Sequence, residues 1–230
     1  MSAPVKIGRA TLYCGDAYDI RPGLGWFDAD VMDPPYAIRT QGAGRFRKSR
    51  PSMDEIAEAG LDKGFDLAII NPLLAGSVVV FCHNDQLAKL LHHVDGQFDR
   101  YAVLAWVKKN PMPVANKHYR PDCEPYVHAW SEGFEPRGSL AEKRRFVIAR
   151  ACREAKRRFG HPTIKPDPVM DKIMRNVAGE SVCDPFMGTG STGVAAIRAG
   201  KSFTGIEKNP AWFEAAVTRI SKANEECAHA

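Results

Sequence analysis

The 230-residue sequence predicts a doubly wound α/β fold, in which helices cover both faces of a mostly parallel sheet. Two observations support this class. Short apolar runs with strand character alternate with longer helical patterns along most of the chain. The 44% hydrophobic and 26% charged content is that of an ordinary globular domain with a core of its own. We therefore expect a single domain over residues 1–230, carrying one short insertion.

The expected elements follow from apolar periodicity, and turn-forming residues separate them. The expected strands span Ile7–Tyr13, Ala29–Met32, Ser77–Cys82, Tyr101–Val107, Tyr126–Trp130, Ser181–Cys183 and Phe203–Ile206. The expected helices span Asp54–Ala75, Asp85–His93, Leu140–Phe159, Pro168–Asn176, Ser191–Ala199 and Ala211–Ala223. Residues 37–51 and 108–121 interrupt the alternation and are expected to be loops. Residues 131–160 leave it as well and become strongly basic, which indicates an insertion at the edge of the fold.

Composition excludes several classes of protein. The six cysteines are scattered without a C-x-x-C pair, so we expect neither a disulfide framework nor a metal site. The longest apolar stretch, Phe65–Phe81, is broken by Asp66, Asn71 and Pro72, so no membrane-spanning helix is expected. We expect a cytoplasmic protein. The net charge of +5 is a mild indication of a polyanionic partner.

The sharpest motif is Asp33-Pro34-Pro35-Tyr36, which directly follows an expected strand. In open α/β sheets, functional residues lie beyond the carboxyl ends of strands. The Asp33 carboxylate and the Pro34 carbonyl are hydrogen-bond acceptors, and the two prolines stiffen the backbone without adding donors. Tyr36 offers an aromatic face for a planar base. The segment is therefore suited to bind an exocyclic amine. The alternative interpretation is a proline-rich turn that only ends a strand.

Such an amine is a poor nucleophile because its lone pair is delocalised into the ring. Two acceptors outside the ring plane make the nitrogen more tetrahedral and direct its lone pair towards an incoming group. This is stabilisation of the transition state by preorganised polar groups, without a covalent intermediate.

A second motif, Asp184-Pro185-Phe186-Met187-Gly188-Thr189-Gly190-Ser191-Thr192, follows another strand and opens a helix. Gly188 and Gly190 permit a tight turn and close approach of a ligand, and the helix N-terminus can bind a carboxylate. Glu207 ends the next strand, 17 residues after Gly190. Acidic residues at about this spacing bind ribose hydroxyls in dinucleotide-type folds. Alone, a G-x-G turn is a weak signal, and Glu207 alone is as often a surface carboxylate.

Together, Asp-Pro-Pro-Tyr and the later Asp-Pro-Phe-x-Gly-x-Gly-Ser-Thr resemble the amino-methyltransferases that modify adenine N6 or cytosine N4 in DNA. The order of the motifs is similar to that of the circularly permuted β class. His161-Pro162-Thr163-Ile164-Lys165-Pro166 resembles a further family segment that helps to hold the methionine moiety of the cofactor. Gly15-Asp16-Ala17 resembles a turn that contacts its adenine. Without the resemblance, Asp16 is a helix N-cap and residues 161–166 are a linker.

The resemblance implies a Rossmann-like fold, S-adenosyl-L-methionine as cofactor and double-stranded DNA as partner. The implied catalytic residues are Asp33, Pro34, Pro35 and Tyr36. The implied cofactor-binding residues are Asp16, Ala17, Asp33, Thr163, Lys165, Asp184, Phe186, Gly188, Gly190, Ser191, Thr192 and Glu207.

A base must be flipped out of the duplex before such an enzyme reaches it, which requires a basic surface around the pocket. Between Arg137 and Arg158 nine Lys and Arg residues stand against two Glu. If this stretch is a helix, its apolar side chains are expected to pack it against the body of the protein, and its basic side chains are expected to contact DNA phosphates. The alternative is a helix whose basic face is only solvated. The expected DNA contacts are Arg39, Arg45, Arg47, Lys48, Arg144, Arg145, Arg157 and Arg158. So short a recognition segment is expected to read a brief site, or to read it as a homodimer.

Three activities remain to be compared. Asp at the first position of the tetrapeptide favours adenine N6 over cytosine N4 within the family. Cytosine C5 methylation requires a cysteine after a proline, and none of the six cysteines follows one. A catalytically silent DNA-binding subunit is the alternative from another class, but such proteins typically lose the acidic residue, a proline or the glycines, which are all present here.

Overall fold

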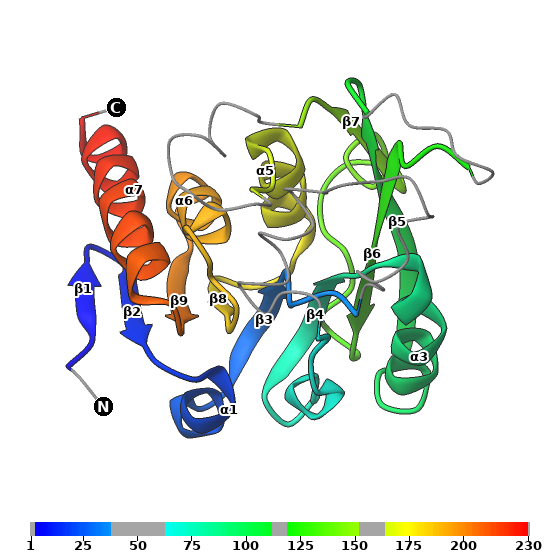
Figure 1. Ribbon diagram of the computed structural model, residues 1–230, viewed down its shortest axis with the longest axis horizontal. Coiled ribbons are helices and arrows are strands. Elements are labelled where there is room, and N and C mark those ends of the chain that lie inside the picture. Colours follow the sequence, from blue (N-terminus) through cyan, green and yellow to red (C-terminus); the bar gives the residue numbers. More distant parts are fainter. Residues whose placement is uncertain (1–2, 38–62, 112–118, 152–163, 230) are drawn as a thin grey trace, which may run out of the picture.

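The computed structural model describes residues 3–37, 63–111, 119–151 and 164–229. Through these residues runs one sheet, with helices against both of its faces (Figure 1). The order of the strands in the sheet is β1-β2-β9-β8-β3-β4-β6-β5-β7. Their bounds are β1 (Val5–Ile7), β2 (Ala10–Cys14), β3 (Phe27–Met32), β4 (Ala75–Phe81), β5 (Arg100–Lys108), β6 (Cys123–Trp130), β7 (Phe146–Ala149), β8 (Ser181–Asp184) and β9 (Ser202–Glu207).

Most neighbouring strands are parallel, as the sequence predicts, but two strands run against the rest. β1 pairs antiparallel with β2, and β6 pairs antiparallel with both β4 and β5. The chain turns away from β3 in opposite directions on its two sides: β3 leads to β4, whereas β8 leads to β9 on the other side. The strand order therefore reverses between β3 and β8. Ligands of open α/β sheets bind at the carboxyl ends of strands beside such a switch point.

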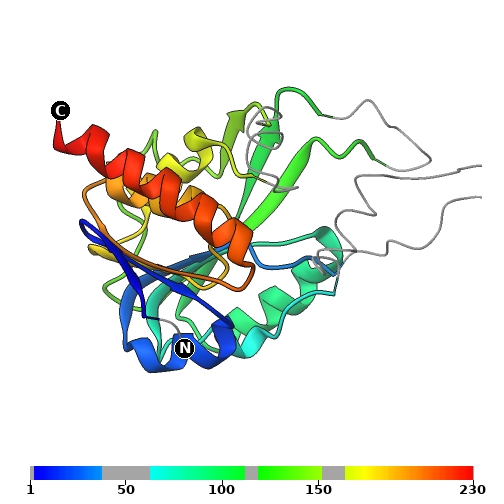
Figure 2. The same cartoon turned by 60° about the vertical axis from the view of Figure 1, so that its left-hand side comes forward.

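The helices lie in two layers (Figures 1 and 2). Their bounds are α1 (Ala17–Ile20), α3 (Asn84–Asp95), α5 (Asp167–Asn176), α6 (Ser191–Arg198) and α7 (Pro210–Ala228), with short 3-10 helices η1 (Arg21–Leu24) and η2 (Leu67–Ile69). One apolar core joins α5, α6 and α7 to the sheet through residues such as Ile173, Ala196 and Ile220. The other joins α1 and α3 to the opposite face, with Ile20 and Leu90 among its members. Burying both faces explains why β4 is apolar and wholly buried.

Two expected elements in the first half of the chain differ from the structure. The expected strand Ile7–Tyr13 is two strands, because Gly8 adopts a φ of 52° and turns the backbone into a hairpin. The expected helix Asp54–Ala75 is wrong over its described part. Residues from 63 onwards form turns and η2, and Ala75 already begins β4. Asn71 closes a turn there, since its carbonyl accepts from the Leu74 N–H at 2.9 Å.

The expected helix Leu140–Phe159 is also wrong over its described part. Residues 140–143 are a turn, and Phe146–Ala149 is the edge strand β7, parallel to β5. The expected docking side chains Phe146 and Ile148 are about half exposed. Lys and Arg favour helices locally. The aromatic and β-branched run Phe-Val-Ile favours a strand, however, and the open edge of β5 supplies the hydrogen bonds of that strand. Residues 152–159 lie outside the described residues.

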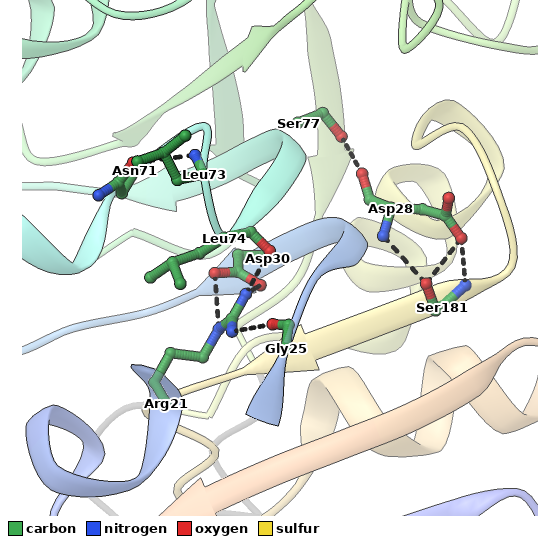
Figure 3. Close-up of polar contacts among 9 residues, drawn as sticks. All are labelled: Arg21, Gly25, Asp28, Asp30, Asn71, Leu73, Leu74, Ser77 and Ser181. Carbon is green, nitrogen blue, oxygen red and sulfur yellow. Dashed lines mark hydrogen bonds and ion pairs between the residues drawn. The ribbon is translucent and has the colours of Figure 1, made fainter. Parts of the chain in front are cut away.

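A buried ion pair holds the base of β3, the strand that carries the Asp-Pro-Pro-Tyr segment (Figure 3). Arg21 is fully buried, and its guanidinium donates to both oxygens of Asp30 at 3.0 and 3.1 Å. The same guanidinium donates to the carbonyls of Gly25 and Leu74. Nearby, Asp28 accepts from the Ser181 hydroxyl and backbone N–H, which ties β3 to β8. These bidentate contacts fix β3 between its neighbours.

Candidate active site

The Asp-Pro-Pro-Tyr segment leaves the carboxyl end of β3, as the sequence predicts. The Tyr36 hydroxyl lies 2.8 Å from Asp33 Oδ1 and folds the segment back on itself. Pro34 is buried, and the Pro35 carbonyl accepts from the Gln86 side chain of α3 at 3.5 Å. The Asp33 side chain keeps 22% of its surface exposed, so a ligand can reach it.

Three further side chains, Lys108, Glu124 and Lys165, surround Asp33 and Tyr36. These five residues are called here the charge network. The Lys165 ammonium, just before α5, contacts Asp33 Oδ2 and lies 2.9 Å from Glu124 Oε1. The other oxygen of Glu124 lies 3.0 Å from Lys108 Nζ. Glu124 Oε1 is also 2.9 Å from the Tyr36 hydroxyl. Two carboxylates and two ammonium groups therefore balance one another in a partly enclosed site.

The electrostatics treat the two carboxylates of the network differently. Burial raises the pKa of Asp33, and Lys165 opposes this increase without cancelling it. Burial raises the pKa of Glu124, but Lys165 and Lys108 outweigh burial and lower that pKa to about 2. Burial lowers the pKa of Lys165, but Asp33 and Glu124 outweigh it and raise that pKa above its ordinary value. The pKa of the Tyr36 hydroxyl is raised by burial and by the two carboxylates, so Tyr36 stays a hydrogen-bond donor.

The segment Asp184–Thr192, called here the glycine loop, joins β8 to α6. Gly188 and Gly190 both adopt positive φ, 52° and 83°, as a tight turn requires. No side chain caps α6, so its first backbone N–H groups can bind an anionic group. The Gly190 α-carbon faces α7: a Cβ atom there would lie 3.1 Å from Ala216 Cβ. Gly190 thus permits close packing of the loop on α7.

Glu207 ends β9 and reaches back to the glycine loop. Its Oε2 accepts from the Gly188 N–H at 2.8 Å, and its Oε1 accepts from the Asn209 N–H at 2.7 Å. Asp16 lies close by, because the neighbouring Gly15 N–H donates to the Glu207 carbonyl. Asp16 caps α1 through the Tyr18 N–H and pairs with Lys208 at 2.7 Å. Ala17, the next residue, is buried in the core.

A pocket with about 400 Å³ of empty space, open solvent included, lies between the two motifs. Its lining comes from the ends of β3 and β4, the start of α5 and the glycine loop: Met32, Asp33, Phe81, Ile164, Lys165, Met170, Asp184, Phe186, Met187, Gly188, Thr189, Ser191 and Thr192. Asp33 and Asp184 follow adjacent strands, which is why motifs about 150 residues apart share one pocket.

The structure thus brings together most of the residues selected from the sequence. Asp33, Lys165, Asp184, Phe186, Gly188, Ser191 and Thr192 line the pocket, and Glu207 contacts its glycine loop. Thr163 lies outside the described residues. Sequence reasoning missed Lys108, Glu124 and the pocket-lining Phe81. Lys108 could have been selected from the sequence, because it is a charged residue at the end of an apolar strand. Glu124 is the second residue of β6 and precedes the expected strand Tyr126–Trp130, so it carried no such signal.

The expected DNA contacts are only partly within the described residues. Arg144 and Arg145 are exposed and lead into β7, where the Arg145 carbonyl accepts from the Ala105 N–H. Arg39, Arg45, Arg47, Lys48, Arg157 and Arg158 lie outside the described residues. Within the part of the chain that the structure describes, no helix has the length and apolarity needed to cross a membrane.

The sheet and its switch-point pocket define a doubly wound α/β protein with a ligand site at the carboxyl ends of its central strands. Residues 27–218 match the N6_N4_Mtase family model, which is described as DNA methylase. The chain therefore belongs to this N6/N4 family of DNA methylases.

Two type II methyltransferases share shorter stretches with this chain. M2.DpnII of Streptococcus pneumoniae is 37% identical over 67 residues, 28% of this chain and 25% of the relative. M2.LlaDCHI of Lactococcus lactis subsp. cremoris is 38% identical over 64 residues, 27% and 24% respectively. The matched stretch is about a quarter of the length of these curated relatives.

Solved structures share the fold across nearly the whole chain. The M1.HpyAVI–SAM complex superimposes with a TM-score of 0.67 at 23% identity, covering 92% of this chain and 99% of its own. PvuII DNA methyltransferase, described as cytosine-N4-specific, gives a TM-score of 0.67 at 14% identity, covering 97% and 94%. At such identities the likeness establishes the Rossmann-like methyltransferase fold that the sequence predicts.

Proposed function

We propose that this protein is a site-specific DNA methyltransferase that moves a methyl group from S-adenosyl-L-methionine to N6 of an adenine flipped out of the duplex. The observation that carries the proposal is the meeting of two motifs in one pocket. Asp33 of the Asp-Pro-Pro-Tyr segment and the glycine loop Asp184–Thr192 face each other at the switch point of the sheet. A base-binding segment and a cofactor-binding loop are thereby held within reach of each other.

The residues present fit this cofactor. The uncapped start of α6 suits the carboxylate of its methionine moiety, and apolar Phe186, Met187 and Ile164 suit its carbon skeleton. Both oxygens of Glu207 accept backbone N–H groups, and the carboxylate retains acceptor capacity for a ribose hydroxyl. M1.HpyAVI, which shares the fold, has been solved as a complex with SAM, and this supports the same cofactor here. When bound, the cofactor supplies an electrophilic methyl group.

The Asp-Pro-Pro-Tyr segment then prepares the nucleophile. The exposed part of the Asp33 carboxylate and the Pro34 carbonyl accept the two amine hydrogens, and the face of Tyr36 stacks on the base. These acceptors are preorganised: the prolines fix the backbone, and the ammonium of Lys165 orients Asp33. Their hydrogen bonds strengthen as the nitrogen becomes tetrahedral, so they favour the transition state over the bound base.

Exposed Arg144 and Arg145 are proposed to contact DNA phosphates beside this site. Residues 131–160 are proposed to recognise the target sequence. Asp33 supports adenine as the target base, by resemblance to family members that carry Asp at this position. Cytosine N4 is the second candidate, because the same geometry serves it and PvuII methyltransferase, described as cytosine-N4-specific, has a similar fold.

The test is methyl transfer from isotope-labelled S-adenosyl-L-methionine to unmethylated genomic DNA, followed by mass spectrometry of the nucleosides and long-read sequencing. N6-methyladenine at a fixed sequence is the expected product. Asp33→Ala is expected to abolish transfer while the cofactor dissociation constant stays within a few-fold, because Asp33 touches the amine and not most of the cofactor.

N4-methylcytosine would overturn the choice of base alone. Tight DNA binding without cofactor binding would instead indicate a catalytically silent partner subunit. Substantial methylation by Asp33→Ala would refute the assignment of the catalytic segment.

A further inference from the structure

Glu124 is the one carboxylate of the charge network that belongs to none of the motifs identified in the sequence. Glu124 is the second residue of β6, and its side chain is only 15% exposed. β6 runs antiparallel to β4, so the start of β6 lies at the edge of the sheet where β3 and β4 end. Phe81, the last residue of β4 and part of the pocket lining, pairs with Tyr126, two residues beyond Glu124. The sheet thus directs Glu124 to the same face as the pocket.

Glu124 shares both polar partners of Asp33. Tyr36 has a single hydroxyl hydrogen and two carboxylate oxygens within reach, Asp33 Oδ1 at 2.8 Å and Glu124 Oε1 at 2.9 Å. Lys165 likewise contacts both carboxylates. Lys108 holds the second oxygen of Glu124 at 3.0 Å and fixes its orientation. The nearly equal distances from the Tyr36 hydroxyl mean that its hydrogen can turn from one carboxylate to the other with little movement of heavy atoms.

The position of that hydrogen decides what Asp33 can accept. With Lys165 on Oδ2 and the Tyr36 hydroxyl on Oδ1, each oxygen of Asp33 already accepts one donor, and an amine N–H must share an oxygen with that donor. When the hydroxyl donates to Glu124 instead, Oδ1 is relieved of the competing donor and accepts an N–H group of the target amine more strongly. Without Glu124, Lys165 and Tyr36 would both concentrate on Asp33 and compete with the amine.

We propose that Glu124 is a positioning residue of the methyl-transfer site: it is the alternative acceptor that draws the Tyr36 hydroxyl off Asp33 when the target amine binds. Glu124 touches neither base nor cofactor and acts through Tyr36 and Lys165. The inference rests on the proposed function, because it concerns how Asp33 is made available to the amine. It holds equally for adenine N6 and cytosine N4.

The test compares Glu124→Ala, Glu124→Gln and the double variant Glu124→Ala/Tyr36→Phe, with exposed Glu214→Ala on α7 as control. Glu124→Ala is expected to lower kcat roughly 10- to 100-fold, because small errors in the position of a catalytic acceptor can cost about that much. KM for DNA and cofactor affinity should stay within about threefold. Glu124→Gln keeps an acceptor oxygen for Tyr36 and is expected to retain more activity. In the double variant no hydroxyl remains to occupy Asp33 Oδ1, so kcat should recover at least about threefold over Glu124→Ala, a non-additive result.

A merely structural role for Glu124 predicts that the double variant is no better than Glu124→Ala, and that result would overturn the proposal. A kcat within twofold of the unsubstituted protein in Glu124→Ala would overturn it too. If Glu124→Ala fails to fold, as melting and cofactor titration would reveal, Glu124→Leu, which fills the space without an acceptor for Tyr36, decides on the same twofold criterion. Absence of methyl transfer by the unsubstituted protein contradicts the proposed function itself, whereas an active parent with an unaffected Glu124→Ala contradicts only the role of Glu124.

Discussion

Glu207 and Gly188 are joined across the pocket edge: the Glu207 carboxylate accepts the Gly188 backbone N–H at 2.8 Å. The contact ties the end of β9 to the glycine loop. One substitution of Glu207 can therefore test this loop contact and the proposed ribose contact together.

Glu207→Gln is expected to weaken S-adenosyl-L-methionine binding about 10- to 100-fold. Both carboxylate oxygens accept backbone N–H groups, and the amide replaces one acceptor by a donor that opposes an N–H. Isothermal titration calorimetry measures the effect. Glu180→Gln is the control, since the Glu180 side chain is 83% exposed at the other end of β8. Equal cofactor affinities for Glu207→Gln, Glu180→Gln and the parent would exclude a contact between Glu207 and the ribose.

Gly190→Ala is expected to lower both the melting temperature and the cofactor affinity. Its Cβ would lie 3.1 Å from Ala216 Cβ and 3.2 Å from Ile220 Cδ1, at a φ of 83°. The strained backbone costs about 1–2 kcal/mol, and forcing the loop off α7 adds about 1–3 kcal/mol. Gly200→Ala is the matched control, because Gly200 also has positive φ (71°) but a Cβ there meets nothing within 4 Å. Gly200→Ala should show the backbone cost alone, and identical melting temperatures for the two variants would argue against close packing on α7.

Asp184 is expected to give the cofactor-free protein a pH-dependent stability. Burial raises the pKa of Asp184 to about 7, against hydrogen bonds from Thr192 and the Phe186 N–H that lower it. An unfolded Asp has a pKa of about 3.9, so the folded state binds the proton more readily. The stabilisation from this group is complete below about pH 4 and is lost as the pH rises through 7.

Asp184→Asn removes the titration and keeps the size of the side chain. Relative to the parent, the variant should therefore gain roughly 2–4 kcal/mol in free energy of unfolding between about pH 4 and pH 8. Urea unfolding at several pH values measures this difference. A gap between the two proteins that stays constant with pH would show that Asp184 does not titrate in this range.

Arg144→Ala/Arg145→Ala is expected to weaken DNA binding and to flatten its salt dependence. Each lost phosphate contact should reduce the slope of log affinity against log salt by about 0.9, so by up to about 1.8 for both. Lys6→Ala/Lys222→Ala removes the same charge from exposed positions on β1 and on α7, which packs against β1 at the opposite edge of the sheet from β7. Cofactor affinity should be unchanged in both variants. A slope equal to that of the control would exclude this pair from the DNA surface.

The local features of this site were predictable from the sequence. The Asp-Pro-Pro-Tyr segment, the glycine loop and Glu207 each follow a short apolar run, and the structure has each at the carboxyl end of a strand. Strand, tight turn and helix start are determined within a few neighbouring residues, by fixed proline φ and by glycine freedom. The expected parallel sheet also indicates that these motifs lie near one another, because parallel strands have their carboxyl ends at the same edge of the sheet.

Only the tertiary structure decided which way each strand runs and what lies beside it. Glu124 reaches the site because β6 is antiparallel, a pairing between segments more than 40 residues apart that no local pattern encodes. Phe146–Ala149 is a strand for the same kind of reason: the free edge of β5 offers backbone hydrogen bonds that outweigh the helix propensity of its basic neighbours. Gly190 is expected from the sequence to permit close approach of a ligand, and only the tertiary structure shows that its α-carbon packs against α7. Contacts between distant segments set these outcomes, and their free energies exceed the few tenths of a kcal/mol per residue by which local propensities differ.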